Sequence, residues 1–165
     1  MHITKKTYIA VAIATALALA HPVTANAASP RWTLDGNLAS YHTERWARHE
    51  LNQDNEGLGL TAHINRDWSV SAGWYRNSYR RGSTYLLAAW TPLHASLPAG
   101  WSLAAGVTAG LDSGYRSDEL ATEPLVGAGL LRVIAPKGWS INLTAVPNAG
   151  AHCSGFIGMQ VSLPI

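Results

Sequence analysis

The chain has 165 residues, of which 47% are hydrophobic and only 13% charged, and its formal net charge is +2. Lys5 and Lys6 account for that excess, so the basic and acidic residues of the remaining chain balance and give no indication of a nucleic-acid partner. Cys153 is the only cysteine, which excludes an internal disulfide and a zinc site built from cysteines.

Residues 1–27 have the features of a secretory signal peptide. Lys5 and Lys6 precede an apolar run over residues 8–20, and Ala25-Asn26-Ala27 provides the small residues of a cleavage site. A membrane anchor is the alternative, but neither this run nor any later one is long enough to span a bilayer as a helix. We therefore expect an exported protein in which residues 28–165 form a single domain.

Apolar side chains alternate with polar or small ones along most of the remaining chain, a period of two that is typical of β-strands. Leu58, Leu60 and Ile64, for example, alternate with glycine, threonine and histidine. Most segments are close to the roughly 9 to 11 residues of a tilted transmembrane strand. The predicted fold is all-β, an eight-stranded antiparallel up-and-down transmembrane β-barrel. Its strands are expected at 34–42, 56–66, 69–78, 83–91, 101–111, 124–134, 139–147 and 154–164.

The connections and the aromatic residues favour a bacterial outer membrane. Short turns alternate with longer polar connections, as in outer-membrane barrels. Tryptophans fall at the short-turn ends in the apolar phase, namely Trp68, Trp90, Trp101 and Trp139. Tyrosines gather at the long-loop end, namely Tyr41, Tyr75, Tyr79, Tyr85 and Tyr115. A soluble β-sandwich would show the same alternation, but it has no reason to place tryptophans and tyrosines at opposite ends of its strands. We therefore expect the protein in the outer membrane of a Gram-negative bacterium.

The opposite phase of the strands predicts the interior, which in an eight-stranded barrel holds side chains or one small ligand. Toward the short turns this phase is polar, with His63, Asn65, Ser71, Ser102, Arg132, Ser140, Asn142, Gln160 and Ser162. Toward the long loops it is small or apolar, with Gly57, Gly59, Gly73, Leu87, Gly106, Gly110, Val126, Ala128, Leu130, Phe156 and Gly158. This arrangement predicts a dry slot for a hydrocarbon chain above a polar floor and disfavours a pore. Alternatively, the glycines only relieve crowding in a narrow barrel.

Two prolines flank the same pair of predicted strands. Pro124 begins the sixth strand and Pro147 ends the seventh, both in the half near the long loops. Because proline donates no backbone hydrogen bond, these strands should pair poorly there and leave a lateral gate for lipid. The simpler interpretation is that both prolines only end their strands.

The stretch "WYRNSYRRGSTY", residues 74–85, places a polar, cationic tip above this slot. Arg76, Arg80 and Arg81 can pair with phosphate groups, although loop arginines often do no more than bind lipopolysaccharide. A histidine emerging from the first strand, His42, together with Ser78, suggests acyl transfer between phosphate-bearing lipids.

The residues from about Tyr41 to the C-terminus resemble the PagP-like lipid A palmitoyltransferases, which are small outer-membrane barrels. The segments that carry the resemblance are "SYHTER", "NEGLGL", "YRNSYRRGSTYLLAAWTPL", "LAAGVTAG", "EPL" and "AVPNAG". The resemblance implies transfer of an acyl chain from a glycerophospholipid donor to lipid A, without a metal or cofactor. We expect the barrel to act as a monomer.

The resemblance also assigns roles to individual residues. His42 and Ser78 match the catalytic histidine and serine of the family, Asn77 falls where the family has aspartate, and Pro124 and Pro147 match its gate. Ala89 falls where the family often has a glycine at the bottom of the acyl pocket, which implies a chain somewhat shorter than palmitate. The remaining residues expected to line the acyl pocket are Leu87, Gly106 and Ala128.

Three departures from the family leave alternatives open. Asn77 cannot accept a proton or stabilise a protonated histidine. Either Glu44 or Asp112 replaces the family aspartate, the reaction runs slowly, or the barrel binds lipid without chemistry. The amphipathic N-terminal helix of the family is missing or reduced to "ASPRWTLDGN", and the chain ends in Ile165 instead of an aromatic residue. A lipid A deacylase using His152 and Ser154 is a third possibility, although no acid lies near them in the sequence.

Overall fold

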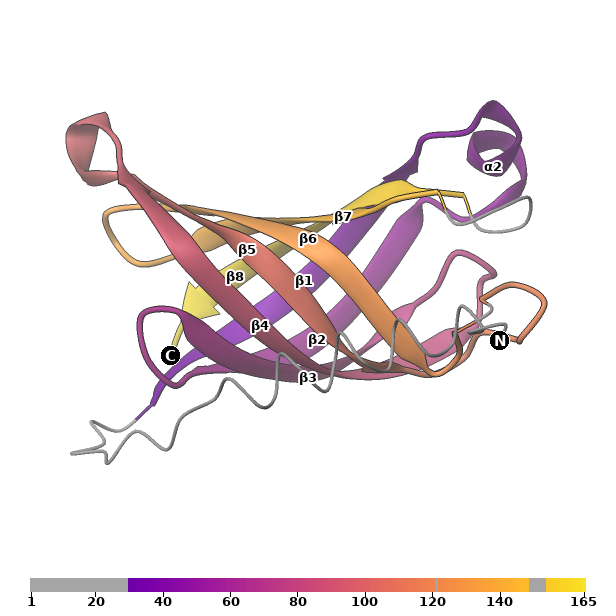
Figure 1. Cartoon of the computed structure of the whole chain (residues 1–165), viewed down its shortest axis with the longest axis horizontal. Coiled ribbons are helices and arrows are strands. Elements are labelled where there is room, and N and C mark those ends of the chain that lie inside the picture. Colours follow the sequence, from indigo (N-terminus) through magenta and orange to yellow (C-terminus); the bar gives the residue numbers. More distant parts are fainter. Residues whose placement is uncertain (1–29, 121, 149–153) are drawn as a thin grey trace, which may run out of the picture.

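The computed structural model describes residues 30–120, 122–148 and 154–165, and the expected signal peptide lies outside them. The chain forms a closed barrel of eight antiparallel strands joined in sequence order (Figure 1). The strands are β1 Arg31–His42, β2 Asp54–His63, β3 Trp68–Arg76, β4 Gly82–Ser96, β5 Ser102–Asp112, β6 Leu125–Ile134, β7 Ser140–Val146 and β8 Phe156–Pro164. Pairing of β1 with β8 closes the barrel, so the predicted fold class is confirmed.

The two ends of the barrel differ. At one end, on the right of Figure 1, lie the helix α2 (Arg45–Glu50) and the connection between β5 and β6. The turn between β4 and β5, with the short 3-10 helix η1 (Pro98–Gly100), lies at the other end. The sequence pattern did not predict α2, because six residues are too few to show a helical period. In the described part of the chain, no helix is both long and apolar enough to cross a membrane.

The outer surface of the barrel is apolar. Leu58 is 65% exposed and Leu93 is 68% exposed, and further large apolar side chains are exposed on every strand from β1 to β6 and on β8. At the short-turn end, Trp68 stacks on Trp90, and Trp101 meets the edge of Trp139 with ring centroids 5.4 Å apart. The four tryptophans therefore lie where the aromatic pattern predicted them.

The tyrosines of the long-loop end divide between the outer surface and the interior. Tyr41 is 59% exposed on the outer surface, as a girdle residue would be. The others, Tyr75, Tyr79, Tyr85 and Tyr115, line the interior cavity instead. The alternation contained this information for Tyr75 and Tyr85, because their neighbours Trp74 and Leu86 point outward and are about half exposed.

A hydrogen-bonded polar layer lies in the short-turn half of the interior. Its centre is Asp35, which is fully buried and accepts hydrogen bonds from Thr33, Thr61 and Ser162. Asn142 donates to Gln160 and Ser162, which extends the layer across β7 and β8. Sequence analysis predicted a polar floor but missed Asp35.

Asn65 was expected in this floor but does not belong to it. Its side chain is exposed, and its oxygen accepts hydrogen bonds from the backbone N–H groups of Asp67 and Trp68 in the β2–β3 turn.

Candidate functional site

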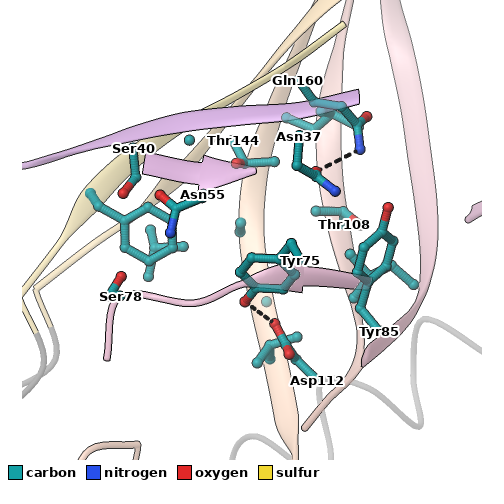
Figure 2. A pocket seen from close by; sticks show the side chains of 18 of the residues that line it. Asn37, Ser40, Asn55, Tyr75, Ser78, Tyr85, Thr108, Asp112, Thr144 and Gln160 are labelled. Carbon is teal, nitrogen blue, oxygen red and sulfur yellow. Dashed lines mark hydrogen bonds between the residues drawn. The ribbon is translucent and has the colours of Figure 1, made fainter. Parts of the chain in front are cut away.

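A cavity of about 620 Å³ occupies the other half of the barrel, between the polar floor and the α2 end. Its size lies within the roughly 300–1,000 Å³ that is typical of small-molecule sites. Figure 2 shows Ser40, Asn55 and Ser78 at one end of it, Asn37, Gln160 and Tyr85 at the other, and the hydrogen-bonded Tyr75 and Asp112 between them. The wall therefore carries polar groups at both ends, with apolar surface contributed mainly by β4 to β8.

His42 and Ser78 meet at the mouth of this cavity. His42 is the last residue of β1, and Ser78 lies in the turn between β3 and β4. The Nε2 atom of His42 is 3.2 Å from the Ser78 hydroxyl, although the residues are 36 positions apart in sequence. Both residues are buried and both line the cavity. The structure thus brings together the two residues that sequence analysis placed at the centre of the chemistry.

Backbone contacts hold the histidine in place. The main-chain N–H of His42 donates to the Gln53 side chain, and its carbonyl accepts from the Arg48 guanidinium at 2.9 Å. Phe156 of β8 packs against the imidazole with ring centroids 5.7 Å apart. Arg48 belongs to α2, so the unexpected helix fixes the position of the candidate base.

Asn77 is beside the site but does not face it. Its side-chain oxygen accepts from the backbone N–H groups of Tyr79 and Arg81 at 2.9 and 3.0 Å. Its amide donates to the Ser83 hydroxyl and to the Gly114 carbonyl at 3.1 and 3.0 Å. With all these hydrogen bonds made, Asn77 has no donor left for a reacting lipid. In this structure Asn77 therefore positions the turn that carries Ser78, and its direct catalytic role stays a prediction.

The two acids considered as replacements for the family aspartate lie in different environments. Glu44 accepts a hydrogen bond from the Trp46 indole at an exposed position and does not line the cavity. Asp112, at the end of β5, is buried in the cavity wall and accepts a hydrogen bond from the Tyr75 hydroxyl at 2.6 Å. Only Asp112 lies within the cavity.

The three arginines expected to contact phosphate divide into two groups. Arg81 is paired with Glu119 and donates to the Gly114 carbonyl, which fastens the β5–β6 connection to the β3–β4 turn. The hydrogen bond that Arg81 donates to the Glu119 carboxylate raises the pKa of Arg81 above its usual value. Arg76 and Arg80 are exposed; Arg76 lies 3.8 Å from Glu56, and Arg80 donates to the Glu50 carbonyl. Surface pairs of this kind are weak, so both remain available for an anionic group.

Three of the four residues expected to line an acyl pocket lie in the wall of the cavity. Leu87, Ala89 and Ala128 line the cavity. Gly106 does not, because the backbone of Trp90 and Thr91 occupies the space beside it: a Cβ atom there would lie 1.9 Å from the Trp90 carbonyl oxygen. The ladder between β4 and β5 is irregular between Trp90 and Leu93, where the chain crowds Gly106. Thr108 takes its place in the lining.

The glycines of β2 and β3 make room for tyrosine instead of widening the slot. A Cβ atom on Gly59 would lie 2.2 Å from the Tyr85 hydroxyl, and one on Gly73 would lie 2.6 Å from it. The Tyr85 side chain therefore lies over the neighbouring strands β3 and β2 and limits the cavity there. For these two positions the alternative of relieved crowding is the better interpretation.

The wall between β6 and β7 is incomplete near the cavity mouth. The two strands pair from Ile134 and Ser140 only as far as Gly129 and Ala145. Within the described residues, β7 offers no ladder partner to the first four residues of β6, Leu125 to Ala128. These four residues line the cavity, as do Val146 and Pro147. Pro124 and Pro147 thus flank the place where pairing stops.

Other polar groups of the mouth were missed by sequence analysis. The Ser40 hydroxyl and the Asn55 side-chain oxygen are buried, line the cavity and have no hydrogen-bond partner among the described residues. Ser40 and His42 occupy the same inward phase of β1, so the alternation of that strand could have revealed Ser40.

Of the two residues considered for a deacylase, Ser154 lines the cavity and donates to the Gly155 carbonyl. His152 lies outside the described residues. None of the described His, Cys, Asp and Glu residues form a group that could hold a metal ion.

Comparison with known proteins does not identify the chain. No protein-family model matches it, and no curated protein matches it with significance. The assignment of a function therefore depends on the cavity and the residues at its mouth.

Proposed function

We propose that the protein is an acyltransferase of the bacterial outer membrane that moves an acyl chain from a glycerophospholipid to lipid A. The observation that carries this proposal is the His42–Ser78 pair at the mouth of the 620 Å³ cavity. A candidate base and a hydroxyl stand there above a space wide enough for one hydrocarbon chain. The apolar outer surface with its tryptophans at one end supports the membrane location.

The site can transfer an acyl chain by direct attack. The imidazole of His42 takes the proton from a lipid A hydroxyl as its oxygen attacks the carbonyl carbon of the donor ester. The Ser78 hydroxyl donates a hydrogen bond to the oxyanion that develops on the carbonyl oxygen. The C–O bond to the glycerol then breaks, and His42 returns the proton to that oxygen, which leaves a lysophospholipid. Atoms and charge balance without a metal or cofactor.

The buried polar groups at the mouth that lack a hydrogen-bond partner can bind the polar part of the phospholipid donor. A buried polar atom without a hydrogen bond costs roughly 1–3 kcal/mol, so such atoms indicate where a ligand supplies the partner. The Ser40 hydroxyl can donate to an ester oxygen, and the Asn55 oxygen can accept from a hydroxyl. Arg76 and Arg80 outside the mouth are placed to meet phosphate groups.

The gap between β6 and β7 provides a route from the bilayer. A sheet edge facing hydrocarbon is costly unless its backbone groups are satisfied, so an unpaired stretch bordering the cavity suggests a lateral gate. Replacing Pro147 with alanine supplies an N–H that can extend the β7 pairing. We expect donor uptake to slow, seen as a lower kcat/KM at low donor concentration, whereas an unchanged kcat/KM would contradict the gate.

The depth of the cavity at Ala89 should set the chain length. Ala89 is buried in the lining, so leucine there fills the lower end of the slot. We expect Ala89→Leu to shift the preferred donor chain to one shorter by a few carbons, measured by competition among phospholipids of defined chain length. The matched control is Ala88→Leu, because Ala88 is exposed on the outer surface. An unchanged preference in Ala89→Leu would show that the chain binds elsewhere.

A lipid-binding barrel without chemistry is the second candidate, and the amide at position 77 favours it. Purified protein in detergent with phospholipid donor and lipid A distinguishes the two. Formation of acylated lipid A together with an equal amount of lysophospholipid supports transfer. Saturable binding of donor with neither product supports the non-catalytic barrel, and loss of a chain from lipid A would indicate a hydrolase.

A further inference from the structure

A second cavity, of about 580 Å³, lies at the short-turn end of the barrel, opposite α2 (Figure 1). Its lining includes residues in or next to the β2–β3, β4–β5 and β6–β7 turns, so the cavity reaches the rim of the barrel. No aspartate or glutamate is among the described residues that line it. Five of the lining residues are basic, namely Arg31, Arg66, Arg132, His63 and His94.

The strand register brings several of these side chains to one height. His63, the last residue of β2, is paired with Arg31 of β1 on one side and with Ser69 of β3 on the other. Residues directly opposite each other in antiparallel strands point to the same face of the sheet. Arg132 comes from β6 and spans the interior, because its guanidinium donates to the Ser69 hydroxyl at 2.7 Å. The end of Arg132 therefore lies beside the row formed by Arg31, His63 and Ser69.

The two arginines of this row lack a counter-ion. Neither Arg31 nor Arg132 forms an ion pair with a carboxylate in the part of the chain that the structure describes. Asp35 of the polar layer does not line this cavity, and its oxygens accept hydrogen bonds from three hydroxyl groups. It therefore attracts Arg132 without contacting it. A guanidinium withdrawn from water with no anion beside it is costly, and an anionic ligand in the cavity removes that cost.

We propose that this cavity is a binding site for a phosphate group that enters from the short-turn end. Guanidinium groups donate pairs of parallel hydrogen bonds to phosphate oxygens, and two of them match the charge of a phosphate dianion. Arg31 and Arg132 supply these charges, and the hydroxyls of Ser96 and Ser102 in the same lining can donate further hydrogen bonds. Soluble phosphate compounds and glycerophospholipid headgroups both carry this group. The site shares no step with the proposed acyl transfer and does not depend on it.

The test uses the full barrel refolded in a nonionic detergent at low ionic strength, with inorganic phosphate as the probe. Titration calorimetry gives the Kd, and the NMR signal of the Arg132 Nε–Hε group reports whether phosphate binds beside it. The variants are Arg132→Gln and Arg31→Gln. Arg31 is exposed at the first residue of β1, so its replacement should leave folding intact if that of Arg132 does not. The matched control is Lys137→Gln, because Lys137 is exposed in the β6–β7 turn and does not line the cavity.

We expect saturable binding of phosphate to the wild-type protein and a shift of the Arg132 signal. Each arginine variant should raise the Kd about tenfold or more, because it removes a hydrogen bond from a charged donor. Lys137→Gln should bind within about twofold of wild type, since exposed charges outside the site contribute little. The Kd of the wild type should rise with salt concentration.

A competition arm identifies the source of the phosphate group. Displacement of inorganic phosphate by phosphatidylglycerol added to the micelles would support a site for lipid headgroups, and displacement by glycerol 3-phosphate alone would support a site for soluble compounds. Absence of saturable binding, or an equal Kd for wild type and folded Arg31→Gln, would overturn the site. Phosphate binding that leaves the Arg132 signal unchanged would place the anion elsewhere, for example at the exposed arginines of the long-loop end, and would overturn it as well.

Discussion

Replacing His42 with alanine is expected to lower acyl transfer by about 10²- to 10⁴-fold, the range typical of a lost general base. The imidazole lies against the Ser78 hydroxyl and can take a proton from an attacking alcohol and return it to the leaving glycerol. Because it acts on the proton in the transition state, the loss should fall on kcat and leave the KM for the donor nearly unchanged. The measurement is steady-state transfer from a labelled phospholipid to lipid A.

The control for this variant is His49→Ala. His49 is an exposed histidine on α2, close to the same end of the barrel. It should retain full activity, and both variants should keep the heat-dependent gel mobility of a folded barrel. A folded His42→Ala protein with wild-type kcat would remove His42 from the mechanism.

Changing Asn77 to aspartate is expected to lower activity, even though the resemblance places an aspartate there. The Asn77 amide donates to the Gly114 carbonyl and to a Ser83 hydroxyl whose own proton is directed at the Ser113 carbonyl. A carboxylate cannot donate, so its oxygen would oppose the Gly114 carbonyl in a fully buried position. Leaving such groups unpaired costs about 1–3 kcal/mol, which corresponds to a roughly 10- to 100-fold loss if it displaces Ser78.

The matched control for Asn77→Asp is Asn65→Asp in the β2–β3 turn. The two hydrogen bonds that Asn65 makes there both use its oxygen as acceptor, so aspartate can keep them. Thermal unfolding and transfer rate should change for Asn77→Asp and remain nearly unchanged for Asn65→Asp. A gain of activity in Asn77→Asp would show that residue 77 does face the chemistry, as the resemblance implied.

The strand pattern was predictable because alternation is a local property. The apolar alternation identified outward-facing residues such as Leu58 and Leu60, and the expected segments overlap all eight strands. The same rule would have placed Tyr75 inward, beside Trp74 outward, had the two faces been read residue by residue. Asp35 could have been found in this way too, because it alternates with the exposed Leu34.

The site residues were predictable only where the side chain itself, such as an imidazole or a hydroxyl, indicates a chemical role. A histidine at the end of β1 and a serine in a polar tip are recognisable from sequence, and they do meet. The role of Asn77 was not recognisable, because it depends on the Gly114 carbonyl, 37 positions away in a connection without regular structure. The exclusion of Gly106 from the cavity likewise depends on an irregularity in β4 that alternation does not reveal.

The most direct test of the account is mass spectrometry of lipid A from Gram-negative cells with and without the protein, repeated with His42→Ala. Phospholipid should first be driven into the outer leaflet to supply the donor. We predict a mass gain of one acyl chain that disappears in His42→Ala, with the chain length set at Ala89. No gain under these conditions, or a gain that persists without His42, would contradict the proposed acyltransferase.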